Sequence, residues 1–219
     1  MLNRSLGGGS VFFAKEPAKK NVINDKNKEL ADFYRSYQKN GCKIVNECKL
    51  PKTDSQFQKV KEGKGSCNFY GRIKTSYACT GKNFNSTKRP DGSWGNGSVM
   101  NQKNCDKQMN LLKNTKIENK DWKQVVREND GKNTLFYLDP PYHGTSNPTT
   151  YADRVMDPKE VCKIAKNIKG KVILSYNDHK DVRSACKGLR MKKVKTTYET
   201  NKSKIGQSKE ANELLIMNF

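Results

Sequence analysis

An aspartate, two prolines and a tyrosine stand together directly after a short apolar segment. The motif Asp139-Pro140-Pro141-Tyr142 follows Leu135-Phe136-Tyr137-Leu138 in the sequence. A short apolar run bounded by breakers is typical of a fully buried parallel strand, and two prolines cannot continue its ladder of hydrogen bonds. We therefore expect the motif at the carboxyl edge of a sheet, where open α/β folds bind ligands.

The chemistry of this motif suits an amino group attached to a planar ring. Asp139 and the backbone carbonyl of Pro140 can accept the two protons of such an amine, and Tyr142 can stack on the ring face. A proline pair taken alone is also compatible with a plain loop, which is the alternative interpretation. The preceding strand, together with the acid and the aromatic ring, favours a functional site.

The composition indicates a partner that carries many negative charges. The chain has 219 residues, of which 33% are hydrophobic, so it forms one domain, or one domain with an insertion. Lys and Arg number 43 against 22 Asp and Glu, which gives a net charge of +21. Such a charge predicts contacts with nucleic acid phosphates. A lysine-rich composition inherited from an AT-rich genome is the alternative.

Cysteine and histidine usage predicts no metal site and no disulfide framework. The seven cysteines include no Cys-x-x-Cys pair, and the two histidines, His143 and His179, add no zinc spacing. We expect reduced thiols in a cytosol-like compartment. No apolar stretch approaches the roughly 20 residues that cross a bilayer, and no signal peptide is recognisable. These features predict a cytoplasmic or nucleoid-associated protein, with a virion or an organelle as alternatives.

The first forty residues have the layout of a nucleotide-binding site. A glycine turn at Gly7 to Gly9 leads into an apolar stretch, and residues 21–25 read as a strand that ends in Asp25. Apolar spacing then predicts a helix over 28–39. Gly7 and Gly9 would allow close approach of a ligand, and Asp25 suits ribose hydroxyls. A simple tight turn is the alternative for the glycine run.

The second half of the chain alternates between strands and helices. We predict strands at 115–118, 135–138, 172–175, 191–198 and 214–217, and helices through Met109 and Leu112, over 121–128, from Asp157 to Gly170 and from Asp181. This alternation predicts an α/β fold with a mostly parallel sheet.

The middle segment differs in character from both flanks. Over 41–105 the apolar runs disappear, and basic residues are interleaved with a few aromatics. This mixture suits phosphate contacts and base stacking; a floppy surface insertion is the alternative. We therefore divide the chain into a first cofactor-binding part (1–40), an inserted segment (41–105) and a catalytic remainder (106–219). The candidate nucleic-acid-binding residues are Lys74, Tyr77, Lys82, Phe84, Lys88 and Arg89.

Taken in order, these segments resemble the Dam-like DNA adenine methyltransferases, which use S-adenosylmethionine. The similarity covers nearly the whole chain. It rests on the first glycine loop (6–13), the acidic strand end and helix (24–34), the start of the target-recognition segment (75–82), the adenine-holding stretch (116–122), the catalytic tetrapeptide (139–142) and the later strands (175–177 and 213–216).

The resemblance implies a Rossmann-type methyltransferase fold, with helices on both faces of the central sheet. It implies transfer of a methyl group from S-adenosylmethionine to adenine that has left the duplex stack, as in restriction-modification systems. The catalytic residues would be Asp139, Pro140, Pro141 and Tyr142. The cofactor-binding residues would be Gly7, Gly9, Asp25, Asp121, Trp122 and Asp139, although Trp122 is also compatible with an ordinary core aromatic.

Two departures from the family pattern leave alternatives open. The family usually begins with a Lys-Trp-x-Gly-Gly-Lys segment around the methionine end of the cofactor, and it has Glu-Pro-Phe where this chain has Asn3-Arg4-Ser5. The first, central strand is therefore expected to be a stub. The chain is then truncated, or completed by a second chain, or a degenerate descendant that serves as a basic structural component of a virion or ribonucleoprotein. RNA is the alternative substrate to DNA.

Overall fold

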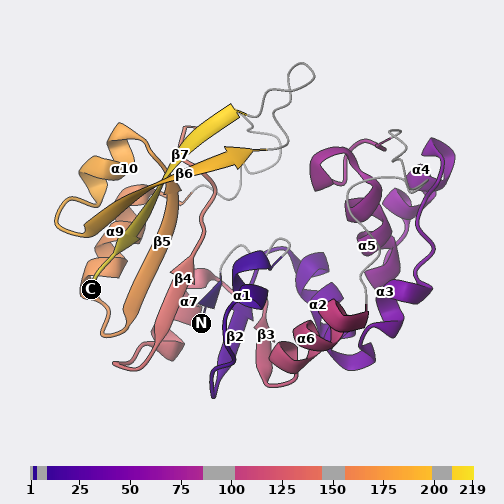
Figure 1. Cartoon of the computed structure of the whole chain (residues 1–219), viewed down its shortest axis with the longest axis horizontal. Coiled ribbons are helices and arrows are strands. Elements are labelled where there is room, and N and C mark those ends of the chain that lie inside the picture. Colours follow the sequence, from indigo (N-terminus) through magenta and orange to yellow (C-terminus); the bar gives the residue numbers. More distant parts are fainter. Residues whose placement is uncertain (1, 4–8, 86–101, 145–155, 199–208) are drawn as a thin grey trace. The chain divides into compact units, whose positions relative to one another are not determined.

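The protein is a mixed α/β structure that divides into two compact units (Figure 1). The computed structural model describes residues 2–3, 9–85, 102–144, 156–198 and 209–219. The sheet unit comprises Met1–Gly8, Val22–Lys26 and Lys120–Phe219, and the helical unit comprises Gly9–Asn21 and Asn27–Asn119. Three candidate site residues, Gly7, Lys88 and Arg89, lie outside the described residues.

The strands of the sheet unit lie on both sides of the first strand, β1. They lie side by side in the order β2 (Asn21–Asn24), β1 (Leu2–Asn3), β4 (Leu135–Leu138), β5 (Lys171–Asn177), β7 (Lys209–Met217) and β6 (Arg190–Tyr198). β1 pairs in parallel with β2 and β4, and β4 pairs in parallel with β5. β7 runs antiparallel to both β5 and β6. The predicted central position of this strand is confirmed, and its expected shortness stays a prediction.

The strand before the tetrapeptide is buried on one face only. Phe136 and Leu138 are 0% and 2% exposed and pack in the hydrophobic core with Val172 and Leu174. Leu135 is 39% exposed, so the prediction of a fully buried strand is wrong for this residue. Because successive side chains of a strand point to opposite faces, only every second residue of β4 enters the core.

Two of the described helices of the sheet unit begin at aspartate caps. The helices are α7 (Trp122–Asn129), α9 (Pro158–Asn167) and α10 (Lys180–Ala185). Asp121 caps α7 and Asp157 caps α9, each accepting a backbone hydrogen bond from two residues further on, and Pro158 occupies the first helical position. The predicted helix start at Asp157 is confirmed. Buried side chains of all three helices join the core, and Figure 1 shows α9 and α10 beside β5.

The helical unit gives regular structure to much of the segment without apolar runs. Its elements are α1 (Ser10–Ala14), α2 (Lys28–Asn40), α3 (Lys43–Glu47), α4 (Asp54–Glu62), α5 (Ser66–Thr75), the 3-10 turn η1 (Tyr77–Cys79), α6 (Gln102–Leu112) and β3 (Thr115–Glu118). Phe57 and Phe69 are buried on α4 and α5. Because isolated aromatics at these positions suffice for a small core, the interpretation of 41–105 as a floppy insertion is wrong for its described helices.

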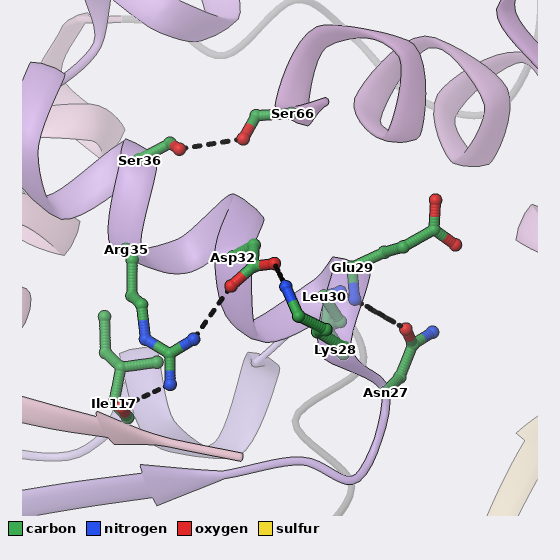
Figure 2. A network of polar contacts seen from close by, with 9 residues as sticks. All are labelled: Asn27, Lys28, Glu29, Leu30, Asp32, Arg35, Ser36, Ser66 and Ile117. Carbon is green, nitrogen blue, oxygen red and sulfur yellow. Dashed lines mark hydrogen bonds and ion pairs between the residues drawn. The ribbon is translucent and has the colours of Figure 1, made fainter. Parts of the chain in front are cut away.

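A chain of polar contacts runs along α2 and ties it to its neighbours (Figure 2). The Asn27 side chain caps the helix by accepting from the backbone nitrogens of Glu29 and Leu30. The Arg35 guanidinium lies 2.8 Å from the Asp32 carboxylate and also donates to the backbone oxygen of Ile117 in β3 at 3.1 Å. The Ser66 hydroxyl at the start of α5 donates to Ser36 at 2.8 Å. These contacts tie α2 to β3 and to the start of α5.

The cysteines are paired, so the prediction of reduced thiols is wrong for six of the seven. The disulfides are Cys42–Cys105 and Cys48–Cys67 in the helical unit and Cys162–Cys186 in the sheet unit, with Cα–Cα distances of 5.9, 5.1 and 5.1 Å. Cys79 is exposed and forms no disulfide. The partners are 19 to 63 residues apart in the sequence, so helix packing brings them together and local spacing could not indicate it.

Membrane insertion of a helix has no support in the part of the chain that the structure describes. None of its helices combines the length and the apolar character needed to cross a bilayer.

Candidate active site

The tetrapeptide lies where the sequence places it, at the carboxyl end of β4. Pro140 is buried, whereas Asp139, Pro141 and Tyr142 are half-buried. Asp25 follows the parallel strand β2, separated from β4 only by β1. Because the carboxyl ends of parallel strands meet at one edge of a sheet, Asp25 and Asp139 belong to the same edge.

The Asp139 carboxylate is partly removed from water and lacks a hydrogen-bond donor among the described residues. Burial, and secondarily the nearby Glu213 carboxylate, raises the pKa of Asp139 to about 6. A desolvated carboxylate without a donor is unfavourable in the free protein. The Asp139 carboxylate can therefore accept hydrogen bonds that the described residues do not supply.

Two side chains from neighbouring strands hold the loop that contains the motif. The Tyr142 hydroxyl donates a hydrogen bond to a Glu213 carboxylate oxygen. The Asn177 side chain accepts from the His143 backbone nitrogen and donates to the His143 carbonyl, both at 2.9 Å. Asn177 and Glu213 face each other as partners in the β5–β7 pairing. The middle of β7 thus fixes the ring of Tyr142, and the end of β5 fixes the backbone immediately after it.

Asn177 and Glu213 are missing from the candidate residues that the sequence supplied. Both stand directly beside apolar strand segments, and both lie in segments that carry the family resemblance. A polar residue at a strand end is a usable signal for a site at a sheet edge. The antiparallel course of β7 decides that its first half meets the end of β5, and this direction could not be inferred from the alternation of strands and helices.

The residues proposed for the cofactor gather partly around the end of β2. The buried Asn24 side chain donates to the Lys120 carbonyl at 3.1 Å and accepts from the Lys120 nitrogen at 2.9 Å. This clasp holds the start of α7 beside Asp25, which is itself 7% exposed. Asp121 is exposed and caps α7. Trp122 is 4% exposed within the hydrophobic core, which favours its interpretation as a core aromatic.

Gly9 occupies a position that requires glycine. It precedes α1 with φ 66°, in the left-handed region. A Cβ at this position would lie 2.7 Å from the Phe13 ring and 3.1 Å from the Tyr34 hydroxyl. The expected glycine turn into a helix is therefore present in the helical unit. Its role toward a cofactor stays a prediction.

The described candidates for nucleic acid contact lie on α5 and the loop that follows it. Residues 76–84 form a loop closed by the Ser76–Phe84 bridge and by a 2.9 Å hydrogen bond from the Tyr77 nitrogen to the Asn83 carbonyl. Tyr77 is 62% exposed. The half-buried Phe84 packs against the buried Phe57, with ring centroids 5.7 Å apart. Phe84 therefore anchors the loop, whereas Tyr77 presents a ring to solvent.

Two lysines accompany these rings. Lys82 is exposed near the closing end of the loop, and Lys74 is half-buried on α5. The backbone oxygen of Lys82 accepts a hydrogen bond from the Lys61 ammonium at 3.1 Å, which ties the loop to α4. The base of the loop is thus held in place, and the loop exposes the ring of Tyr77 and the side chain of Lys82 to solvent.

Comparison with known proteins agrees with this arrangement. A family model described as D12 class N6 adenine-specific DNA methyltransferase matches residues 6–200. The chain is also similar to the Type II methyltransferase M.MjaIII of Methanocaldococcus jannaschii, with 24% identity over 98% of this chain and 86% of the relative. The chain belongs to the D12 class of N6 adenine-specific DNA methyltransferases.

Proposed function

We propose that Asp139, Pro140 and Tyr142 bind the adenine that this DNA adenine methyltransferase modifies. The observation that carries the proposal is the half-buried Asp139 carboxylate, which has no hydrogen-bond donor among the described residues and lies on a loop held by Asn177 and Glu213. The exocyclic amine of adenine supplies the missing donor. Its other proton meets the Pro140 carbonyl, and the ring stacks on Tyr142.

These contacts act on the reacting nitrogen and on its position. Asp139 and the Pro140 carbonyl accept one hydrogen bond each from the amine. These two hydrogen bonds favour a pyramidal nitrogen, whose lone pair is no longer conjugated with the ring. The Glu213 hydrogen bond fixes the plane of Tyr142 and so the plane of the stacked base. Correct placement of two reacting groups is a large part of catalysis. The adenine has to leave the duplex stack to reach these residues.

S-adenosylmethionine is the methyl donor that we propose, and it supplies an activated methyl group, so the chain needs no covalent nucleophile. Asp25 at the end of β2 fits the ribose hydroxyls, because it is buried at the same sheet edge as Asp139. Asp121 offers an exposed carboxylate at the start of α7 for the cofactor adenine. We propose that Gly7 and Gly9 allow the cofactor to approach the backbone closely. A second chain that completes the cofactor site stays a prediction from the sequence.

We further propose a Rossmann-type methyltransferase fold for the catalytic part. Parallel pairing of β2, β1, β4 and β5, followed by the antiparallel β7, supports it. The division into a cofactor part (1–40), a target-recognition segment (41–105) and a catalytic remainder (106–219) is likewise a proposal.

The test of the proposed function uses a labelled methyl donor. Protein with DNA of varied sequence is expected to place label on N6 of adenine, and RNA of the same sequences is expected to stay unlabelled. Asp25→Ala is expected to weaken binding of the demethylated product in calorimetry, whereas Asp54→Asn, an exposed acid on α4, leaves it unchanged. Label on cytosine alone would refute the assignment, and label on RNA alone would reassign the substrate.

The exposed side of the 76–84 loop makes a separate prediction about DNA affinity. Lys82→Ala is expected to weaken binding to all DNA sequences alike and to reduce the slope of log affinity against log salt by about one, because one phosphate contact is lost. Tyr77→Ala is expected to cost about 1–3 kcal/mol of binding if its ring stacks on a base. Lys132→Ala, an exposed lysine of the sheet unit, serves as the control. Affinity that is independent of salt would contradict this interface.

A further inference from the structure

The only two histidines of the chain meet beside an aspartate in the sheet unit. His143 and His179 are 36 residues apart in the sequence, yet their ring centroids lie 5.0 Å apart. His143 Nε2 is 3.1 Å from Asp181 Oδ2, and His179 Nδ1 is 3.6 Å from the same oxygen. One ligand atom from each residue lies within 4.8 Å of the other two.

Separate elements hold these three side chains in place. His143 follows Tyr142, and its backbone is clasped by Asn177 at the end of β5. His179 caps α10, and Asp181 lies in the first turn of that helix. The strand end therefore fixes the backbone at His143, and α10 fixes the backbone at His179 and Asp181, because the Arg183 nitrogen donates to the His179 carbonyl at 3.0 Å. Preorganised donors of this kind lower the cost of binding an ion.

The spacing of the donor atoms fits a tetrahedral transition metal. Zinc binds imidazole nitrogen and carboxylate oxygen at about 2.0–2.1 Å, which places two ligands of a tetrahedral site about 3.4 Å apart. The observed 3.1 and 3.6 Å lie on either side of this value. The side chains are 30%, 33% and 55% exposed, so solvent can supply a fourth ligand. Two imidazoles with one carboxylate favour zinc and its neighbours over magnesium or calcium.

We propose that His143, His179 and Asp181 bind one divalent transition metal ion, which joins the loop after the catalytic tetrapeptide to the start of α10. The ion replaces two weak contacts, the 3.1 Å hydrogen bond between His143 Nε2 and Asp181 Oδ2 and the 3.2 Å hydrogen bond from the Asp181 nitrogen to His179 Nδ1 that caps α10. A cation at a helix N-terminus opposes the helix dipole, but the Asp181 carboxylate offsets this charge. The site is structural, and it stands whether or not Asp139 acts on adenine as proposed.

The experiment measures metal binding directly on the full chain with its disulfides intact. After treatment with a chelator, the protein is titrated with Co²⁺ by absorbance and with Zn²⁺ by calorimetry. We expect one equivalent to bind and the thermal midpoint to rise. His143→Asn, His179→Asn and Asp181→Asn are each expected to weaken binding by at least about ten-fold, since even the loss of a supporting contact to a ligand has that effect.

The variants are chosen to separate ligation from folding. Asparagine at position 179 keeps a good helix cap while removing the imidazole. Asp54→Asn removes an acid from the first turn of α4 and is expected to bind metal as the unaltered chain does. Cys79→Ser tests the thiol that forms no disulfide. Circular dichroism without metal establishes that each variant is folded.

Three results would overturn the proposal. They are the absence of stoichiometric binding in the intact chain, binding that survives all three ligand substitutions in folded protein, and binding that disappears only in Cys79→Ser.

Discussion

Replacing Asp139 by alanine is expected to lower the rate of methyl transfer by at least about 10³-fold while leaving DNA affinity nearly unchanged. The carboxylate is the one acceptor in the tetrapeptide that carries a charge, and it is half-buried at the carboxyl end of β4. Its loss removes the acceptor that frees the amine lone pair, whereas the 76–84 loop is untouched. Single-turnover rates with labelled donor, measured beside DNA affinity, check both halves of the expectation. An undiminished rate would exclude Asp139 from the reaction.

The ionised carboxylate of Asp139 is expected to lower the free energy of unfolding. The pKa of Asp139 is raised from 3.8 to about 6, chiefly by burial, so the folded chain binds more protons than the unfolded chain between these pH values. Its stability therefore falls as pH rises through this window. Asp139→Asn removes the ionised form and is expected to stabilise the protein by on the order of 1–3 kcal/mol at pH 8. The difference should disappear below about pH 4, and denaturant unfolding at both pH values measures it.

Most regular elements could be predicted because their signals are local. Apolar spacing predicts a helix over 28–39, and α2 spans Lys28–Asn40; β3 occupies the predicted residues 115–118. The placement of Asp139 after a parallel strand follows from the strand and the prolines alone. In each case the physical cause, a period or a breaker, lies within a few residues of its effect.

The unpredicted features depend on elements that meet only in the folded chain. The Cys42–Cys105 disulfide needs the residue before α3 to lie beside α6, across 63 residues of sequence. The bond between Tyr142 and Glu213 needs β7 to run antiparallel to β5. The cluster of His143, His179 and Asp181 needs the tetrapeptide loop to reach the start of α10. Spacing along the chain contains none of these three pieces of information.

Replacing Glu213 by glutamine is expected to shift the pH dependence of methyl transfer toward lower pH. Only ionised Asp139 can accept a charge-assisted hydrogen bond from the adenine amine. The value of kcat/KM should therefore rise with pH through the pKa of Asp139, which is about 6 in the free enzyme. Burial is the larger cause of this raised pKa, and the Glu213 charge adds to it. Without that charge the pKa of Asp139 falls, and the acid limb of the profile moves with it. Rates at low donor concentration from pH 5 to pH 8 measure the limb.

Two further variants separate the charge of Glu213 from its hydrogen bond. Glutamine keeps an oxygen that can accept from the Tyr142 hydroxyl, so the maximal rate of Glu213→Gln should stay close to that of the unaltered enzyme. Tyr142→Phe removes the hydroxyl that donates to Glu213 but leaves the charge in place, so its rate should fall while its acid limb stays near pH 6. Glu213→Ala should show both effects, because charge and acceptor are lost together. Removing the Glu213 charge must lower the pKa of Asp139. If the acid limb does not move in Glu213→Gln, Asp139 is not the group whose ionisation limits the reaction.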